Sequence, residues 1–343
     1  MLKRIINTKL VASLLVLALG SALAQDAFDI AVHFPGELGG NPLELPIAAG
    51  VERVDADFDN VNIRIIEGGP ASDWESSIIA LAATGQYELI ITFTDGMPQI
   101  LETVSVLFPD QKFALLDSQA PELANVYSLV YSDEALGFLG GAFAGLLASN
   151  PDTTRDADQP TIGLLAGTPY PAMDEKIHPG YQAGAHHVDP DVEVLFAAVG
   201  DWNNPNRARD LALNMFNRGA TAIMSITGGG DSGVHRAAAE TDAYAVAVNT
   251  NQNALQPGVI LASVLKRLDN SIYSVVERAM AGGLPYGTVE TAGVAEGAIS
   301  LAEDELYAEH VPAEVRERMT AIVAGMQSGE VDYMALLQAE LGD

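Results

Sequence analysis

The clearest fold signal in the chain is Leu89-Ile-Ile-Thr92, then a helix-like segment over Met97–Leu107, then Lys112-Phe-Ala-Leu-Leu116. Short continuous apolar runs of this kind are typical of strands that are buried on both faces. A strand, a helix and a second strand in succession form a βαβ unit, whose two strands run parallel. The stretch therefore predicts an α/β fold built on parallel sheets.

The same alternation continues on both sides of this stretch. The remaining expected strands are Asp29–His33, Asn62–Ile66, Val126–Val130, Thr161–Leu165, Glu193–Phe196, Thr221–Ser225, Ala243–Ala247 and Val259–Ala262. The remaining expected helices are Trp74–Thr84, Asp174–His186, Asn206–Arg218, Ser232–Glu240 and Lys266–Ala281, with further helical spacing at Val311–Met326 and Val331–Leu341. Right-handed crossovers between parallel strands then give doubly wound sheets.

A polar segment bounded by prolines, Asn150–Pro160, divides the expected strands into two sets. The segment before it, Glu134–Ser149, is small, apolar and rich in glycine, and we expect a buried helix near the junction of two lobes. The chain is also longer than one hydrophobic core usually holds, which favours two domains. We predict a lobe over 25–132, completed by roughly 253–343, and a second lobe over 133–252 that includes the junction helix.

In open α/β sheets, ligands bind at the carboxyl ends of the strands. Two facing lobes would place two such edges around one central cleft. The candidate loops are therefore those that follow the expected strands: 34–41, 93–96, 117–118, 167–170, 200–203, 227–230 and 249–252.

The N-terminus has the pattern of a secretory signal peptide. Lys3 and Arg4 precede an apolar run from Leu10 to Leu23, and Ala22-Leu23-Ala24 matches a cleavage site. The apolar run is shorter than the roughly 20 residues that a spanning helix needs. The chain contains no cysteine, which excludes a lipid anchor on cysteine and any disulfide. We therefore predict residues 1–24 as a signal peptide and an unanchored periplasmic protein.

Charge argues against nucleic acid as a partner. The formal net charge is −29, and the acidic residues are spread along the chain. A negative field of this size repels nucleic acid and anionic lipid.

The residue types that catalysis and metal binding use do not occur here in the spacings that these functions require. The histidines show no HExxH or other paired spacing, so no metal site is expected. There is no cysteine nucleophile and no G-x-S-x-G elbow. Asp95, Asp117 and Asp201 lie at strand ends, where carboxylates serve either glycoside hydrolysis or the binding of hydroxyls and amines. No base with an orienting partner accompanies them, so we predict a binding protein without a cofactor rather than an enzyme.

Two loops favour ligand binding. In Asp201-Trp-Asn-Asn-Pro205, Trp202 stands between polar residues at a strand end, where it could stack on a flat ligand or pack in the core. Gly228-Gly-Gly-Asp-Ser-Gly233 opens a helix but lacks the lysine of a phosphate-binding loop. Its backbone N–H groups could bind a ligand oxygen, or the loop could be a tight turn only.

These segments resemble the basic membrane protein (PnrA-like) family of ABC-transporter substrate-binding proteins. The resemblance runs from about Ile30 to about Ala281. It is carried by Tyr87–Thr92, Phe108–Ser118, Tyr131–Ala142, Gly180–Gly184, Gly200–Pro205, Gly228–Val234 and Ala262–Tyr273. It implies two Rossmann-like lobes of the type I periplasmic-binding-protein class, a hinge, and an ABC permease in the inner membrane as partner.

The resemblance also implies a purine nucleoside or nucleobase that is stacked on aromatics, with ribose hydroxyls held by carboxylate and lysine. By motif, it assigns ligand contacts to Asp117, Trp202, Gly229, Gly230 and Lys266.

Three features depart from the family's pattern, and one of them is the missing lipid-attachment cysteine. Asn249 replaces an aspartate, and an amide can still accept a hydrogen bond but carries no charge. Leu43 replaces an aromatic, with Phe34 as a neighbouring aromatic that could take its place. A secreted hydrolase on the same scaffold and an extracytoplasmic sensor for a membrane kinase remain alternatives.

Overall fold

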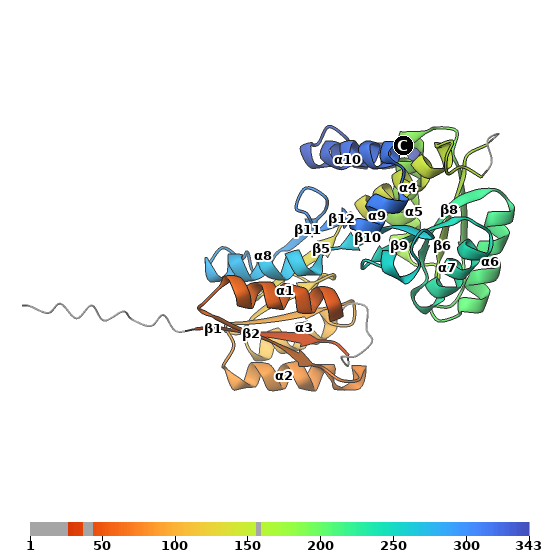
Figure 1. Cartoon of the computed structure of the whole chain (residues 1–343). Coiled ribbons are helices and arrows are strands. Elements are labelled where there is room, and N and C mark those ends of the chain that lie inside the picture. Colours follow the sequence, from red (N-terminus) through yellow and green to blue (C-terminus); the bar gives the residue numbers. More distant parts are fainter. Residues whose placement is uncertain (1–26, 37–43, 156–158, 343) are drawn as a thin grey trace, which may run out of the picture.

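The computed structural model describes residues 27–36, 44–155 and 159–342 as two α/β lobes (Figure 1). The predicted signal peptide and Leu43 lie outside the described residues. Every strand expected from the sequence is present, with ends that differ from the expectation by three residues or fewer except at β10, which runs on to Lys266. The α/β fold with parallel sheets is thus confirmed.

The first sheet has the strand order β11-β5-β4-β3-β1-β2 and is parallel throughout. Its strands are β1 (Phe28–Phe34), β2 (Val61–Glu67), β3 (Leu89–Phe93), β4 (Lys112–Leu116), β5 (Val126–Tyr131) and β11 (Val289–Ala292). Helices α1 (Glu44–Asp57) and α8 (Leu268–Met280) cover one face, and α2 (Trp74–Thr84) and α3 (Pro98–Leu107) cover the other. Side chains of β1 alternate between these two cores, as a pleated strand requires.

The second sheet repeats this order as β12-β10-β9-β8-β6-β7. Its strands are β6 (Thr161–Ala166), β7 (Glu193–Ala198), β8 (Ala220–Ile226), β9 (Tyr244–Asn249), β10 (Ile260–Lys266) and β12 (Ile299–Leu301), of which only β12 is antiparallel to its neighbour. Helices α4 (Asp133–Ser149) and α5 (His178–Val188) cover one face. Helices α6 (Pro205–Asn217) and α7 (Asp231–Glu240) cover the other.

Helix α4 is the glycine-rich junction helix, and every residue from Ala135 to Ala148 is buried. Its backbone meets that of α5 without intervening side chains. A Cβ on Gly141 would lie 1.9 Å from the carbonyl oxygen of Tyr181, and one on Gly184 would lie 2.0 Å from that of Phe138. The glycines therefore fix a closely packed helix pair, at a cost in helix propensity.

The chain crosses between the lobes at three places: between β5 and α4, between β10 and α8, and between β11 and β12. The predicted division of the chain differs from this arrangement. We expected residues from about 253 onward to complete the first lobe. Within that range, only β11 pairs in the first sheet and only α8 packs on it. Strands β10 and β12 pair in the second sheet, because β10 continues the parallel ladder beside β9.

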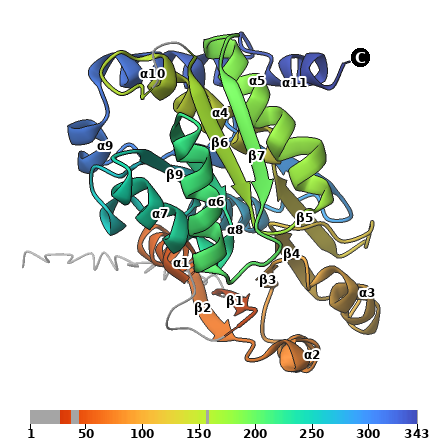
Figure 2. The same cartoon turned by 90° about the vertical axis from the view of Figure 1, so that its right-hand side faces the viewer.

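The C-terminal helices also belong to the second lobe. These are α9 (Glu305–His310), α10 (Ala313–Ser328) and α11 (Tyr333–Leu341), and Figure 2 shows α10 and α11 across the same end of the second lobe as α4 and α5. Helix α11 packs on α5, where Glu340 Oε1 lies 2.8 Å from His186 Nδ1. Among the described residues, no helix is both long enough and apolar enough to cross a membrane.

Candidate functional site: a cleft between the lobes

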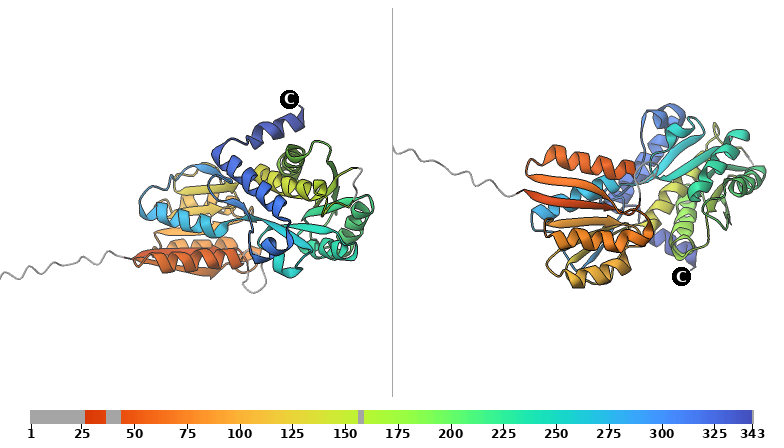
Figure 3. Two further views of the ribbon diagram at one scale, coloured as in Figure 1. Left: turned by 45° about the horizontal axis from the view of Figure 1, so that its top comes forward. Right: turned by 90° about the horizontal axis from the view of Figure 1, so that it is seen from below.

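The two lobes lie side by side, joined by the crossing segments (Figure 3). Two cavities, of about 740 and 650 Å³, are lined by residues that follow strands of both sheets. The first cavity includes Asp95, Asp133, Tyr170 and Lys176; the second includes Leu45, Gly229, His235 and Leu255. Both share Asp117, Trp202, Ile226, Asn249 and Lys266, so they form one continuous cleft.

Asp117 and Asn249 occupy equivalent places in the two lobes. Each lies at the carboxyl end of the fourth strand of its lobe, counted along the chain. Both have left-handed backbones, with φ of 59° and 69°. Aspartate and asparagine tolerate this conformation better than other residues with a Cβ. The turn aims a short polar side chain into the cleft from each side, and the two side chains differ in charge.

Thr94, after β3, is a more unusual case. Its φ is 79°, although a β-branched residue rarely adopts a positive φ. Its topological counterpart after β8 is Gly228, with φ of 61°. Backbone strain of this kind is commonly kept at functional sites.

A lysine at the second crossing links the charged groups of the cleft. Lys266 Nζ donates to Asp117 Oδ1 at 3.0 Å and lies 3.4 Å from Asp133 Oδ1. Burial alone would lower the pKa of Lys266, but the two carboxylates outweigh it and raise the pKa above its usual value. The ammonium therefore stays charged and holds both carboxylates at the junction of the lobes.

Tyr131, the last residue of β5, lies beside the cluster that Lys266 forms with Asp117 and Asp133. Its ring centroid lies 5.7 Å from Lys266 Nζ, within the range of a cation–π contact. Its hydroxyl is buried and donates to Ser271 Oγ at 2.8 Å, and burial raises its pKa. Nearby, Ser118 Oγ donates to Asp95 Oδ1 at 2.9 Å. The carboxylates of the first lobe are thus held in fixed positions.

The second lobe contributes aromatic rings instead. Trp202, in the loop after β7, is 39% exposed, so the alternative that it packs in the core does not hold. Its ring lies 5.7 Å from that of Tyr170 at an angle of 51°. A Cβ on Gly167 would lie 2.3 Å from the Trp202 ring, so the glycine lets the indole lie flat on the backbone. The two rings form a corner that faces the first cavity.

The structure separates the two predicted glycines. Gly229 lines the second cavity, whereas Gly230 is buried against Thr227 and lines neither cavity. Asp231 Oδ1 accepts from the backbone N–H and from the hydroxyl of Thr227, at 2.9 and 2.7 Å. The turn before α7 is therefore held by its own carboxylate.

The prediction for Phe34 is wrong. Phe34 is 1% exposed and belongs to the core between the first sheet and α1 and α8, together with Ile30 and Val32. The period-two alternation of β1 turns its ring away from the strand ends, so it lines neither cavity of the cleft.

Several cleft residues were not among the predicted contacts, and three of them bear on the site. Tyr170 lies in the candidate loop 167–170 and Asp133 follows β5 by two residues, so both could have been found. Lys176 could not, because it projects from a π-helical turn over Met173–Ile177 that the periodicity reads as ordinary helix. Its Nζ lies 3.4 Å from Glu134 Oε1 at the start of α4.

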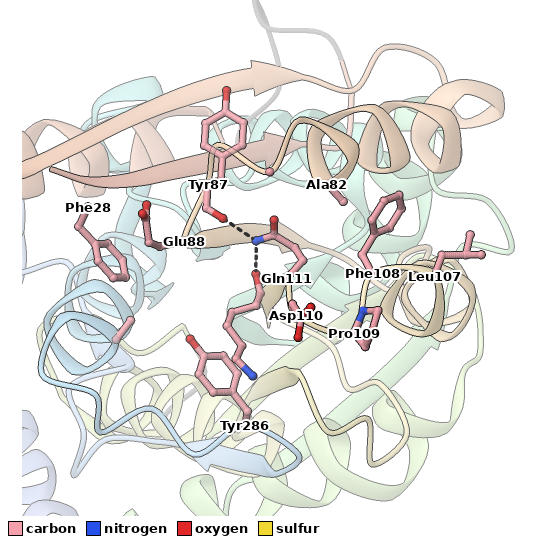
Figure 4. A pocket seen from close by; sticks show the side chains of 13 residues that line it. Phe28, Ala82, Tyr87, Glu88, Leu107, Phe108, Pro109, Asp110, Gln111 and Tyr286 are labelled. Carbon is pink, nitrogen blue, oxygen red and sulfur yellow. Dashed lines mark hydrogen bonds between the residues drawn. The ribbon is translucent and has the colours of Figure 1, made fainter. Parts of the chain in front are cut away.

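A separate cavity of about 650 Å³ lies at the other edge of the first sheet, where β1, β3 and β4 begin (Figure 4). Gln111 closes its floor by donating from Nε2 to the carbonyl oxygens of Tyr87 and Lys112, at 2.9 and 3.0 Å. Lys112 Nζ lies 5.0 Å from the ring centroid of Tyr286. This outer cavity is lined by one lobe only. Among the described residues, no group of three or more acidic or histidine side chains could hold a metal ion.

Two α/β lobes of this topology define the type I periplasmic-binding-protein fold. A solute-binding protein of an ABC transporter from Conexibacter woesei superposes with a TM-score of 0.71 at 21% identity, over 89% of this chain and 98% of that chain.

The family is more specific than the fold. The chain belongs to the family described as ABC transporter substrate-binding protein PnrA-like, which it matches over residues 27–331. This is a family of extracytoplasmic solute-binding proteins that work with transporter permeases and are not enzymes. "Basic membrane protein D" of Borreliella burgdorferi is 26% identical over 72% of this chain and 71% of that protein. The "ABC transporter nucleoside-binding protein BmpA" of Lactococcus lactis is 21% identical over 76% of this chain and 75% of that protein.

Proposed function

We propose that the chain captures a purine nucleoside or nucleobase in the cleft and delivers it to the permease of an ABC importer. The observation that carries this proposal is the pairing, in one cleft, of an exposed aromatic corner on the second lobe with fixed carboxylates on the first. A nucleoside has the matching two parts, a flat ring and a hydroxylated sugar. The Lactococcus relative with a nucleoside in its name supports the same ligand class.

We propose a task for each group. The ligand ring would stack on Trp202, because an indole face gives a large contact area with little loss of side-chain freedom. Sugar hydroxyls would donate to Asp117 and Asp133, whose oxygens already lie around Lys266. Hydrogen bonds to charged acceptors are stronger than those between neutral groups. Asn249, which like Asp133 belongs to the second lobe, would add an uncharged partner opposite Asp117.

We further propose that the mature protein begins after Ala24 and is free in the periplasm. The signal pattern and the absence of cysteine support this. Mass spectrometry of the protein from a periplasmic extract should give a mass that starts at Gln25, without lipid.

The ligand is tested best with one tryptophan as the probe. The chain has two tryptophans. Trp74, in α2, lines neither cavity of the cleft; its ring packs on Gly96, and its Nε1 donates to the carbonyl oxygen of Gly69. In Trp74→Phe, Trp202 is the sole tryptophan. Protein that has been unfolded and refolded to remove bound ligand should show fluorescence quenching with guanosine, inosine or adenosine, and calorimetry should give a matching Kd.

The control is Trp202→Phe, which keeps Trp74 and should show much weaker quenching, because Trp74 lines neither cavity. A refolded protein that responds to ribose or amino acids but to none of the purines would refute the proposed ligand. Chromatography of inosine after long incubation should recover it intact, and release of hypoxanthine would favour the hydrolase alternative.

A further inference from the structure

The second cavity of the cleft exposes leucine side chains from both lobes. Leu45, in the first turn of α1, is 76% exposed, and Leu255, in the short turn Asn253–Leu255, is 67% exposed. They come from opposite lobes and line the same cavity as Trp202. Two large apolar side chains left in water on facing walls of a ligand cleft indicate an apolar occupant.

Three polar side chains of this cavity, those of Asp231, Asn251 and Gln252, are already engaged with the protein. Asp231 accepts two hydrogen bonds from Thr227. Asn251 donates to Asp304 Oδ2 at 2.8 Å and accepts from the N–H of Asn253 at 3.0 Å. Gln252 Nε2 donates to the carbonyl oxygen of Val248. These groups hold the wall in place and offer little to a ligand.

His235 adds no charge to the wall that carries Leu255, although its buried Nε2 has no hydrogen-bond partner among the described residues. It is 4% exposed on α7, and burial lowers its pKa to about 4, so the ring is neutral at physiological pH. Val248 and Leu268 add further apolar surface to the same lining.

The first cavity holds more charged groups than the second. Asp95, Asp133, Lys176 and the hydroxyl of Tyr170 are gathered there, next to Lys266. Trp202 and Asn249 lie at the boundary that both cavities share. A ligand whose polar part lies in the first cavity and whose ring stacks on Trp202 would direct the far edge of that ring into the second.

We propose that the second cavity binds an apolar substituent on the purine ring, so that the preferred ligands are hydrophobically substituted nucleosides. This inference rests on the proposed function for the ring and the sugar, and it adds a specificity that Leu45 and Leu255 provide.

The test compares nucleosides with their benzyl derivatives on the refolded full-length mature protein. Calorimetry would measure adenosine with N6-benzyladenosine, and guanosine with N2-benzylguanosine. In at least one pair the benzyl nucleoside should bind about tenfold more tightly than its parent, since a buried ring of this size contributes at least one such factor. The double variant Leu45→Ser/Leu255→Ser should lose that advantage and bind the parent nucleoside unchanged.

Leu107→Ser is the matched control, because Leu107 is 58% exposed beside the outer cavity and should leave both affinities unchanged. Parent binding without a benzyl advantage would overturn the inference and leave the proposed function standing. The same holds if the double variant weakens parent and derivative equally, because the leucines would then only meet each other on closure. Binding of neither compound would overturn both proposals.

Discussion

The two lobes share one strand order but contribute different chemistry to the cleft. Around the first sheet, the strand ends present carboxylates, with Asp95 and Asp117 held by Ser118 and Lys266. Around the second, the equivalent ends present Trp202, glycines and the uncharged Asn249. A duplicated scaffold can therefore divide recognition, with hydrogen bonding on one wall and stacking on the other. The difference lies mainly at the strand ends, since each sheet is covered by one helix pair on each face.

Each lobe contains one buried neutral histidine, and acid should destabilise both. Burial lowers the pKa of His33 and of His235 from 6.5 to about 4. The unfolded chain therefore binds more protons, so stability is lost as the pH falls from 6.5 toward 4. Between pH 7 and pH 5 each histidine should reduce the free energy of unfolding by about 2 kcal/mol.

Denaturant unfolding of His33→Gln and His235→Gln at the two pH values checks this expectation. Each variant should lose about half of the pH dependence of the free energy of unfolding that the two histidines produce together. If both keep the full slope of the native protein, the buried histidines are not its source.

The helix pairs that cover the two sheets should differ in their tolerance of a methyl group. A Cβ at Gly184, between α5 and α4, would lie 2.0 Å from a carbonyl oxygen, so Gly184→Ala should cost about 3 kcal/mol. The corresponding pair in the first lobe is α1 and α8, where a Cβ at Gly50 would lie 3.0 Å from Asp269. Gly50→Ala should be much milder, because improved helix propensity offsets part of the clash. Equal losses of stability in urea titrations would show that the two pairs are packed alike.

Replacing Asp117 by asparagine would give both lobes the same uncharged side chain at this strand end. Asp117→Asn keeps a residue that tolerates the left-handed backbone, but it weakens the hold on Lys266 and on ligand hydroxyls. Affinity for a nucleoside should fall about 30-fold, as expected for hydrogen bonds to charged groups. Calorimetry measures the change, and Asp110→Asn, beside the outer cavity, should leave affinity intact. Unchanged binding by Asp117→Asn would remove the carboxylate from the proposed site.

The stacking wall should have the smallest single effect. Trp202→Ala should weaken nucleoside binding about tenfold, and Tyr170→Ala should weaken it less, because Tyr170 supports the indole from the side. Ribose alone should bind both variants as it binds the native protein. A larger loss for Tyr170→Ala than for Trp202→Ala would reverse the roles of the two rings.

Continuous apolar runs located the β-strands, because buried parallel strands have no polar face. The short edge strand β11, Val289-Glu-Thr-Ala292, lacks this signal, since it is paired on one side only and mostly exposed. Helix α1 was also missed; it contains Pro46 and Gly50, which obscure a helical pattern. The lobe assignment of the C-terminal part failed because no local sequence feature of the segment Ile260–Lys266 indicates which sheet this segment joins.

The site was predictable where function depends on strand ends. Asp117, Trp202 and Asn249 line the cleft because parallel strands bring their carboxyl ends to one edge. Lys266 lines it too, but only the family resemblance pointed to it, because the sequence placed it at the start of a helix. Phe34 was misplaced because a residue at a strand end can face the core or the cleft, and one position of alternation decides which. Lys176 depends on a π-helical turn, which three-dimensional packing imposes and no periodicity reveals.

The crossings between the lobes have a consequence for the order of synthesis. The first sheet begins at Phe28, yet its edge strand β11 ends at Ala292 and its covering helix α8 precedes that strand. A chain that emerges from its N-terminus exposes one apolar face of this sheet until nearly three hundred residues are available. The second lobe has by then almost all of its own strands. No single cut in the chain can therefore release either lobe intact, and the two must mature together although they have separate sheets.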